Sequence, residues 1–135
     1  MPFPPTLRLA ARQRRIREAL DARSLDALVV TAVANIRYLT NHAGSAGVLV
    51  LTRDAAHLLV DFRYQEAVER LQASPAACPD LRVWSVSASY DEALLHCLQT
   101  LGVAVVGFEA AHVTVATHAW WERNALARQD RKSVV

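Results

Sequence analysis

Two short apolar runs, separated by a brief polar link, place the strongest constraint on how this chain can fold. Residues 48–51 and 57–60 are rich in Val and Leu, and the link at 53–56 contains Arg53 and Asp54. Apolar runs of this length are typical of strands that are buried on both faces. Because so short a link cannot carry a crossover, the two runs must form an antiparallel hairpin.

Strands and helices alternate on both sides of this hairpin. The spacing of apolar residues predicts helices at 7–23, 63–73, 90–101 and 115–127, a helical turn at 35–39, and further strands at 26–32, 82–86 and 103–108. Helices that follow strands imply crossovers and largely parallel pairing, so one hairpin strand must run against the others. The pattern predicts an α/β three-layer sandwich, with a mixed sheet of five or six strands flanked by helices.

Residues that start and stop helices support these boundaries. Ser89 and Glu92 have the spacing of a capping box, and Gly102 is placed to end the helix that follows. Thr6 and Thr114 are predicted to cap the first and last helices. Cys97 falls on the apolar stripe of its helix, where we expect a buried side chain.

Composition excludes several classes of protein. A chain of 135 residues, 53% of them hydrophobic, fits one globular domain, and its net charge of +2 is too small to indicate a nucleic-acid partner. No apolar run approaches the roughly 18 residues of a membrane span, and nothing resembles a signal peptide. Two cysteines, Cys78 and Cys97, without a paired motif favour a reducing, cytoplasmic location.

The usual catalytic motifs do not occur. The histidines lack the spacing of metal ligands, so no metal site is predicted; they are His42, His57, His96, His112 and His118. Ser45 directly follows Gly44 and precedes a strand, unlike the serine of a nucleophile elbow. No glycine-rich loop has phosphate-binding spacing. We therefore predict no catalytic residue in this chain.

The segment Asp61, Phe62, Arg63 and Tyr64 is the most suggestive, because it joins a strand to a helix. Strand ends in open α/β sheets often form binding surfaces. There, an exposed Arg63 could bind a carboxylate through two parallel hydrogen bonds. Alternatively, Asp61 caps the helix and Arg63 pairs with an acidic neighbour. Both interpretations remain open from the residues alone.

Five collinear segments together resemble the N-terminal domain of the creatinase/prolidase/aminopeptidase P family; they are residues 25–30, 35–40, 44–47, 59–64 and 106–109. The similarity extends from about Arg8 to about Leu126. The resemblance implies a ribonuclease H-like α/β sandwich, in agreement with the element order. It also implies that the domain precedes a "pita-bread" catalytic domain that cleaves Xaa-Pro bonds with two divalent metals, usually manganese, cobalt or zinc.

The resemblance further implies a non-catalytic role for this chain alone. In the family, the domain supplies oligomer contacts and narrows access to the active site, so we expect a homo-oligomer that works with its own catalytic domain. Carried over by position, Arg63 would touch a substrate carboxylate in a neighbouring subunit, with Phe62 and Tyr64 shaping the wall. Residues 41–43, Asn-His-Ala, depart from the commoner Gly-Phe-Thr.

The resemblance also divides the chain into a tail at 1–6, the family domain at 7–127 and a non-family stretch at 128–135. Residues 130–135 are those that a common sequencing-adapter sequence encodes, so we expect a truncated gene read. A domain without its catalytic partner would expose an apolar face, for which Trp120, Trp121 and Phe108 are the candidates, although burial in the domain's own core is favoured for Phe108. Two alternatives remain: a free-standing dimerisation or interaction module, and a flavodoxin-like binder of a small ligand.

Overall fold

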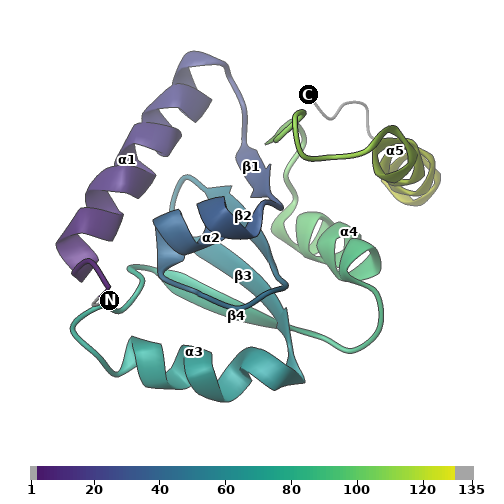
Figure 1. Cartoon of the computed structure of the whole chain (residues 1–135). Helices are drawn as coiled ribbons and strands as arrows, with labels where there is room; N and C mark the ends of the chain where they lie inside the picture. The colour runs from purple at the N-terminus through teal and green to yellow at the C-terminus, as the bar shows by residue number, and fades with distance from the viewer. Residues whose placement is uncertain (1–2, 130–135) are drawn as a thin grey trace.

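Five strands form a single sheet in the order β4-β3-β2-β1-β5 (Figure 1). The computed structural model describes residues 3–129, with side chains as far as residue 125. Within it the strands are β1 (Ala27–Val30), β2 (Val48–Thr52), β3 (Ala56–Asp61), β4 (Leu81–Val86) and β5 (Val106–Phe108).

Strand β2 runs antiparallel to both of its neighbours, β1 and β3. Strand β5 pairs in parallel with β1, and β4 pairs in parallel with β3. Four strands therefore share one direction and only β2 opposes them, which confirms the predicted hairpin and the mixed sheet. A turn at Arg53 and Asp54 joins the hairpin, where the Thr52 hydroxyl donates to Asp54 and to the Ala55 carbonyl.

Helices cover both faces of this sheet and make the predicted three layers. The helices are α1 (Thr6–Ala22), α2 (Val33–Thr40), the 3₁₀ turn η1 (Phe62–Tyr64), α3 (Gln65–Gln72), α4 (Tyr90–Leu101) and α5 (Val115–Gln129). Helices α1, α2 and α3 lie on one side, whereas α4 and α5 lie on the other (Figure 1). None of the helices in residues 3–129 is long and apolar enough to span a membrane.

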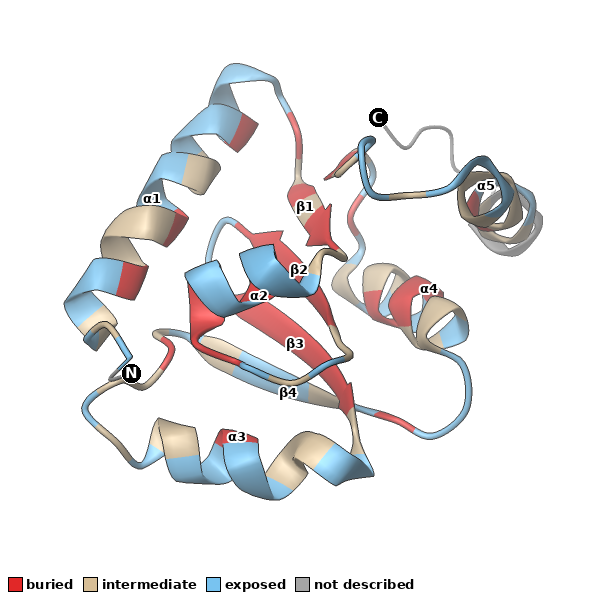
Figure 2. Cartoon of the chain, viewed as in Figure 1, coloured by how far each residue is buried: buried red, intermediate tan, exposed pale blue. Residues whose placement is uncertain are grey.

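Alternation along the strands divides the core between these two layers. Leu49 and Leu51 of β2 pack in the cluster beneath α1, α2 and α3. Val48 and Val50 pack in the cluster beneath α4 and α5. Figure 2 shows β2 and β3 buried along most of their length. Each such side chain contributes about 1.5–3 kcal/mol by leaving water, so the middle of the sheet is its most stable part.

The N-terminus of α1 differs from the prediction. Thr6 does not cap the helix, because Pro5 is the N-cap residue and Thr6 already lies in the first turn. The Thr6 hydroxyl instead donates to the carbonyl oxygen of Ala77, at 2.6 Å. It therefore ties α1 to the loop before β4, a partner that no local sequence pattern could indicate.

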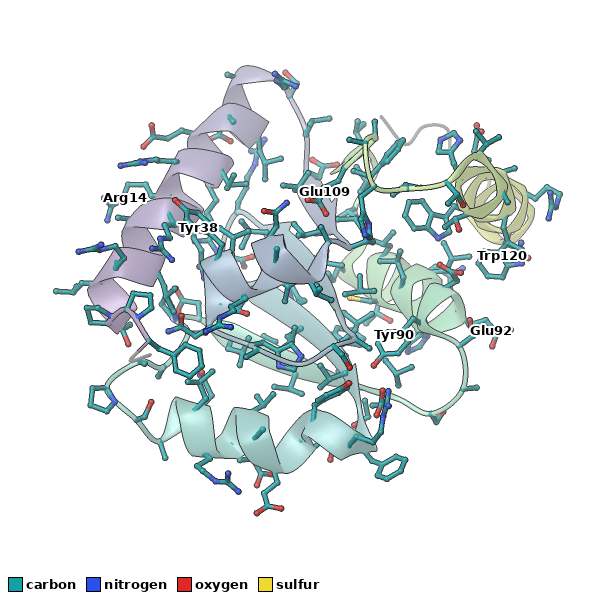
Figure 3. The ribbon with its side chains drawn as sticks, viewed as in Figure 1. Arg14, Tyr38, Tyr90, Glu92, Glu109 and Trp120 are labelled. Atoms are coloured by element: carbon teal, nitrogen blue, oxygen red, sulfur yellow. The ribbon has the colours of Figure 1, made fainter. Side chains whose placement is uncertain are left out.

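Helix α2 is longer than the predicted turn because a distant carboxylate caps it. Glu109, just after β5, accepts hydrogen bonds from the backbone N–H groups of Thr31 and Ala32 at 2.7 and 2.9 Å. The Asn35 amide donates to the same carboxylate. Free N–H groups at a helix start are costly when unpaired, so this contact extends the helix. Figure 3 shows Glu109 beside the first turn of α2.

Strand β5 is shorter than predicted for a related reason. The Asp26 carboxylate accepts hydrogen bonds from the backbone N–H groups of Ala104 and Val105. Those two groups are therefore held by a side chain and do not enter the strand ladder. The sheet pairing begins only at Val106.

The C-terminal helix corrects a prediction about the surface. Trp121 is only 3% exposed, and its indole N–H donates to Asp91 of α4 at 2.7 Å. Trp120 and Phe108 are partly buried against the same cluster. The expectation that Trp121 lies on an exposed apolar face is therefore wrong, because α5 packs this ring against α4. Of the predicted tail at 128–135, residues 130–135 lie outside the described part of the chain.

Candidate functional site at the end of strand β3

Strand β3 leads directly into η1, and Asp61 occupies the junction. Its carboxylate accepts from the backbone N–H of Arg63 at 3.1 Å, which caps the turn. The same carboxylate accepts from Nε and Nη2 of Arg63 at 2.8 and 3.0 Å. Asp61 is thus both the helix cap and the acidic neighbour of Arg63, as one of the two interpretations of this segment expected.

A tyrosine from another element holds this aspartate. Tyr90 begins α4, and its phenol accepts from the Asp61 backbone N–H at 3.1 Å while it donates to the Asp61 carboxylate. Ser89 fixes the start of α4 by accepting from the backbone N–H of Glu92, so its half of the predicted cap is formed. Tyr90 therefore contacts both the main chain and the side chain of Asp61, from the side of α4 that faces the end of β3 (Figure 3).

These contacts determine the charge state of the cluster. Hydrogen bonds from Arg63 and then from Tyr90 hold the pKa of Asp61 well below its usual value. Arg63 gains a raised pKa from the same carboxylate. Burial, followed by its hydrogen bond to Asp61, raises the pKa of Tyr90 to about 12. At neutral pH the aspartate and arginine are charged, and Tyr90 is a neutral donor.

The three residues predicted to contact substrate point to different surroundings. Phe62 is 81% exposed, so its ring presents an apolar face to solvent. The guanidinium carbon of Arg63 lies 5.1 Å from the centre of the Tyr64 ring, a cation–π distance. Tyr64 is half-buried, and its hydroxyl shares a hydrogen bond of 2.8 Å with Ser45. The structure therefore brings Arg63 and Tyr64 into contact and leaves Phe62 projecting outward.

The loop before β2 forms the wall beside Tyr64. The His42 ring is buried and meets the Tyr64 ring edge-on, with centroids 5.3 Å apart. A Cβ at Gly44 would lie only 2.6 Å from Nε2 of His42 and 2.8 Å from Cδ1 of Tyr64. Only glycine fits between these two rings, so Gly44 serves close packing rather than loop flexibility. The Ser45 hydroxyl shares its hydrogen bond with Tyr64, so this loop and η1 are joined at both His42 and Ser45.

A hollow of about 480 Å³ opens between this loop and α3. Its walls are mainly apolar and include aromatic rings; they come from Phe3, Asn41, His42, Ala43, Gly44, Tyr64, Ala67, Val68, Arg70, Leu71 and Ser74. Such a surface can receive an apolar side chain but offers few polar groups to orient it. The charged pair at Asp61 and Arg63 is therefore the chemically specific part of this region.

The described residues do not assemble a metal site. Across residues 3–129, no group of three or more His, Cys, Asp or Glu side chains comes together to hold an ion. His57 lies near the start of β3 and accepts from the Trp84 indole N–H, whereas His118 pairs with Glu122 on α5.

Sequence reasoning missed two members of this architecture, Tyr90 and Glu109. Tyr90 lies between Ser89 and Glu92 of the predicted capping box, and its partner Asp61 lies 29 positions away. Glu109 lies in the segment 106–109 that resembles the family, and its partners lie 74 to 78 positions away. A parallel sheet brings successive strand ends to one edge, and that was the available signal for Asp61 meeting the start of α4.

Comparisons with known proteins agree with this architecture. Residues 12–130 match the model of the Creatinase/Prolidase N-terminal domain, and the chain belongs to this family. The solved N-terminal domain of cytoplasmic peptidase PepQ from Mycobacterium tuberculosis H37Rv is 31% identical, with a TM-score of 0.75, over 93% of this chain and 91% of that one. The N-terminal domain of a Corynebacterium diphtheriae putative metallopeptidase is 26% identical, with a TM-score of 0.69, over 87% of this chain and 89% of that one.

Longer relatives extend well beyond this domain. A Bacillus subtilis (strain 168) protein named "Uncharacterized peptidase YqhT" is 26% identical over 105 residues, which are 78% of this chain and 28% of the relative. An Xaa-Pro dipeptidase from Bacillus anthracis has the same fold, with a TM-score of 0.74 and 23% identity over 85% of this chain and 31% of that one. The chain thus spans about a third or less of these two relatives.

Proposed function

We propose that this domain is the non-catalytic N-terminal part of an Xaa-Pro aminopeptidase or dipeptidase, a metal-dependent hydrolase. In this proposal a catalytic domain in the complete protein carries two divalent metals, manganese, cobalt or zinc. The chain described here shapes access to that site and contributes contacts between subunits of a homo-oligomer in the cytoplasm. The observation that carries the proposal is the 31% identity with the N-terminal domain of peptidase PepQ over 93% of this chain.

Within this proposal, Arg63 meets the carboxylate of a peptide substrate bound to a neighbouring subunit. Its side chain is 58% exposed, and it lies at the carboxyl end of β3. Exposed Phe62 and half-buried Tyr64 flank it and supply apolar surface on either side. Arginine suits this task because its planar fork matches a carboxylate and is always charged.

The proposal is tested with the protein encoded by the complete reading frame at this locus. We expect the purified protein to release the N-terminal residue from peptides or dipeptides with proline in second position, and to require a divalent metal. We expect the 135-residue chain alone to have no such activity. A complete protein that lacks the second domain, or that has it and cleaves no Xaa-Pro bond, would contradict the proposal.

Substitution of Arg63 tests its role within the active protein. Arg63→Ala should raise KM for an Xaa-Pro dipeptide roughly tenfold to a hundredfold and change kcat little, because a charge-assisted hydrogen bond to substrate is lost. Arg53→Ala is the matched control, since the Arg53 side chain is 57% exposed, close to that of Arg63, and pairs with Asp21 away from this site. Equal KM values for the Arg63 variant and the control would remove Arg63 from the substrate site.

One observation favours a second candidate, a free-standing interaction module. This chain covers 91% and 89% of the solved chains from Mycobacterium tuberculosis and Corynebacterium diphtheriae, so those chains are scarcely longer than the domain itself. A domain of this family can therefore fold as a separate chain. The reading frame downstream of this chain distinguishes the candidates: metal ligands encoded there favour the peptidase, and their absence favours the module.

A further inference from the structure

The guanidinium of Arg63 is held on two sides. The Asp61 carboxylate binds its Nε and Nη2 edge at 2.8 and 3.0 Å. The guanidinium carbon lies over the Tyr64 ring, 5.1 Å from its centroid. A long side chain with 58% exposure would otherwise sample many rotamers. These two contacts restrict both the direction and the plane of the group.

Each of those contacts is itself fixed from another element. Tyr90 of α4 binds Asp61 twice, through the backbone N–H and through the carboxylate. Ser45, in the loop before β2, binds the Tyr64 hydroxyl at 2.8 Å. Arg63 is therefore positioned by α4 and by the 42–47 loop, although it touches neither through a hydrogen bond. Of the two supports, Tyr90 is the more buried and makes the larger number of hydrogen bonds.

The guanidinium also keeps donors for a second acceptor. Arginine has five N–H donors in its side chain, and the pair with Asp61 uses two of them. The remaining donors belong to a group whose orientation is already set. Binding a second carboxylate then costs less conformational entropy than it would with a free arginine.

We infer that Tyr90 is a positioning residue that, through Asp61, orients Arg63 toward a substrate that ends in a free carboxylate. This inference rests on the proposed function. It adds that Tyr90 improves substrate binding only for peptides whose C-terminal carboxylate lies within reach of Arg63. The Tyr90 hydroxyl does not touch substrate; it acts only through Asp61 and Arg63.

The test is a double-mutant cycle in the complete peptidase, with Tyr90→Phe, Arg63→Ala and the double variant. Tyr90→Phe removes one hydroxyl and no charge. Two substrates are compared, an Xaa-Pro dipeptide and the same dipeptide with an amidated C-terminus. We expect Tyr90→Phe to raise KM for the free dipeptide roughly fivefold, to leave kcat unchanged and to leave KM for the amide unchanged. In the Arg63→Ala background it should have no further effect.

Tyr38→Phe is the matched control. Tyr38 is a half-exposed tyrosine on α2 that stacks with Arg12, outside the site. It should leave KM for both substrates at the wild-type value. Thermal unfolding of each variant accompanies the kinetics, so that a loss of folded protein is not counted as a change in KM.

The outcomes distinguish the proposed contact between Arg63 and substrate from the positioning role of Tyr90. If Arg63→Ala leaves KM unchanged, the proposed contact between Arg63 and substrate fails. If Arg63→Ala raises KM but Tyr90→Phe does not, the proposed contact stands and the inference about Tyr90 is overturned. An equal rise for the free and the amidated dipeptide also overturns it, because that would indicate a general structural defect.

A second measurement uses the 135-residue chain itself and needs no activity. In ¹⁵N-labelled chain, the Nε–H signal of Arg63 should exchange slowly with solvent, because that group is held by Asp61. Tyr90→Phe should speed this exchange severalfold, whereas Tyr38→Phe should not. An unchanged exchange rate in the Tyr90 variant would show that Tyr90 does not position Arg63.

Discussion

Strand β3 carries one polar side chain near each end, and the two ends differ in how they hold it. His57, near the start, is buried and accepts a hydrogen bond of 3.0 Å from the Trp84 indole N–H. Asp61, at the other end, pairs with the exposed Arg63 and with Tyr90. One end is closed beneath neighbouring side chains, whereas the other opens to solvent.

Both groups have a lowered pKa, yet for opposite reasons. Burial lowers the pKa of His57 because it penalises the charged ring, and Asp54 and Arg82 act more weakly in opposite directions. Partners lower the pKa of Asp61 because they favour the charged carboxylate. His57 is therefore kept neutral as part of the core, and Asp61 is kept charged as part of a surface. Only the second arrangement leaves a charged group able to meet a ligand.

The largest loss of folding stability is expected at Leu59, which lies between the two ends of β3. Leu59 is fully buried, and Leu59→Ala should destabilise the chain by about 2–5 kcal/mol through lost burial and a cavity. Urea unfolding at pH 7.5 measures this. Val83→Ala on the neighbouring edge strand, where the side chain is 47% exposed, should cost about 0.5 kcal/mol. Equal losses of unfolding free energy for the two variants would show that burial within β3 does not stabilise the sheet more than burial on its edge strand.

A smaller change in folding stability is expected at His57, at the buried end of β3, and this change depends on pH. His57 has a folded-state pKa below its unfolded value of 6.5, so the unfolded chain takes up the proton first. The stabilising contribution is complete above about pH 6.5 and declines as the pH falls below it. His57→Gln should flatten this part of the profile of melting temperature between pH 7.5 and 5.

The exposed His96 provides the control for that measurement. Its ring lies edge-on to the same Trp84, with centroids 6.1 Å apart. In the His96→Gln variant, melting temperature should fall between pH 7.5 and 5 as steeply as in the wild type. If melting temperature falls just as steeply in the His57→Gln variant, His57 is not the group that responds to pH.

The smallest effect is expected at the open end, because solvent screens an exposed ion pair. The folded-state pKa of Asp61 lies below its unfolded value of 3.8, so its contribution is complete above about pH 4 and is lost as the pH falls further. Asp61→Asn should flatten the acid limb of the melting profile between pH 4 and 2. Glu66→Gln, which breaks the exposed pair with Arg70, should leave that limb steep.

Local patterns in the sequence were sufficient for most of the fold. The hairpin followed from the short link at 53–56, and the crossovers followed from helices behind β3, β4 and β5. Gly102 ends α4 with a φ of 69°, as its position predicted, and Thr114 caps α5 by accepting from the Thr117 backbone N–H. These features depend on residues three or four positions apart, which is the range that periodicity reports.

The candidate site was predictable in its location but not in its contacts. Its place at a strand end followed from the order of elements, and Asp61 with Arg63 followed from their closeness in sequence. The contacts of Tyr90 and Glu109 could not be predicted from local patterns, because their partners lie 29 and 74 to 78 positions away in the sequence. Two segments this far apart meet only after the sheet has fixed their register.

The sequence by itself determined the α/β class, the hairpin and the membership of Arg63 in a strand-end surface, since each depends on periodicity or on neighbours along the chain. Only the tertiary structure decided that Tyr90 holds Asp61, that Glu109 lengthens α2 and that Trp121 is buried against α4. The physical reason is that a hydrogen bond requires its atoms to lie within about 3 Å of one another. Packing between distant segments sets that distance, and no local pattern encodes it.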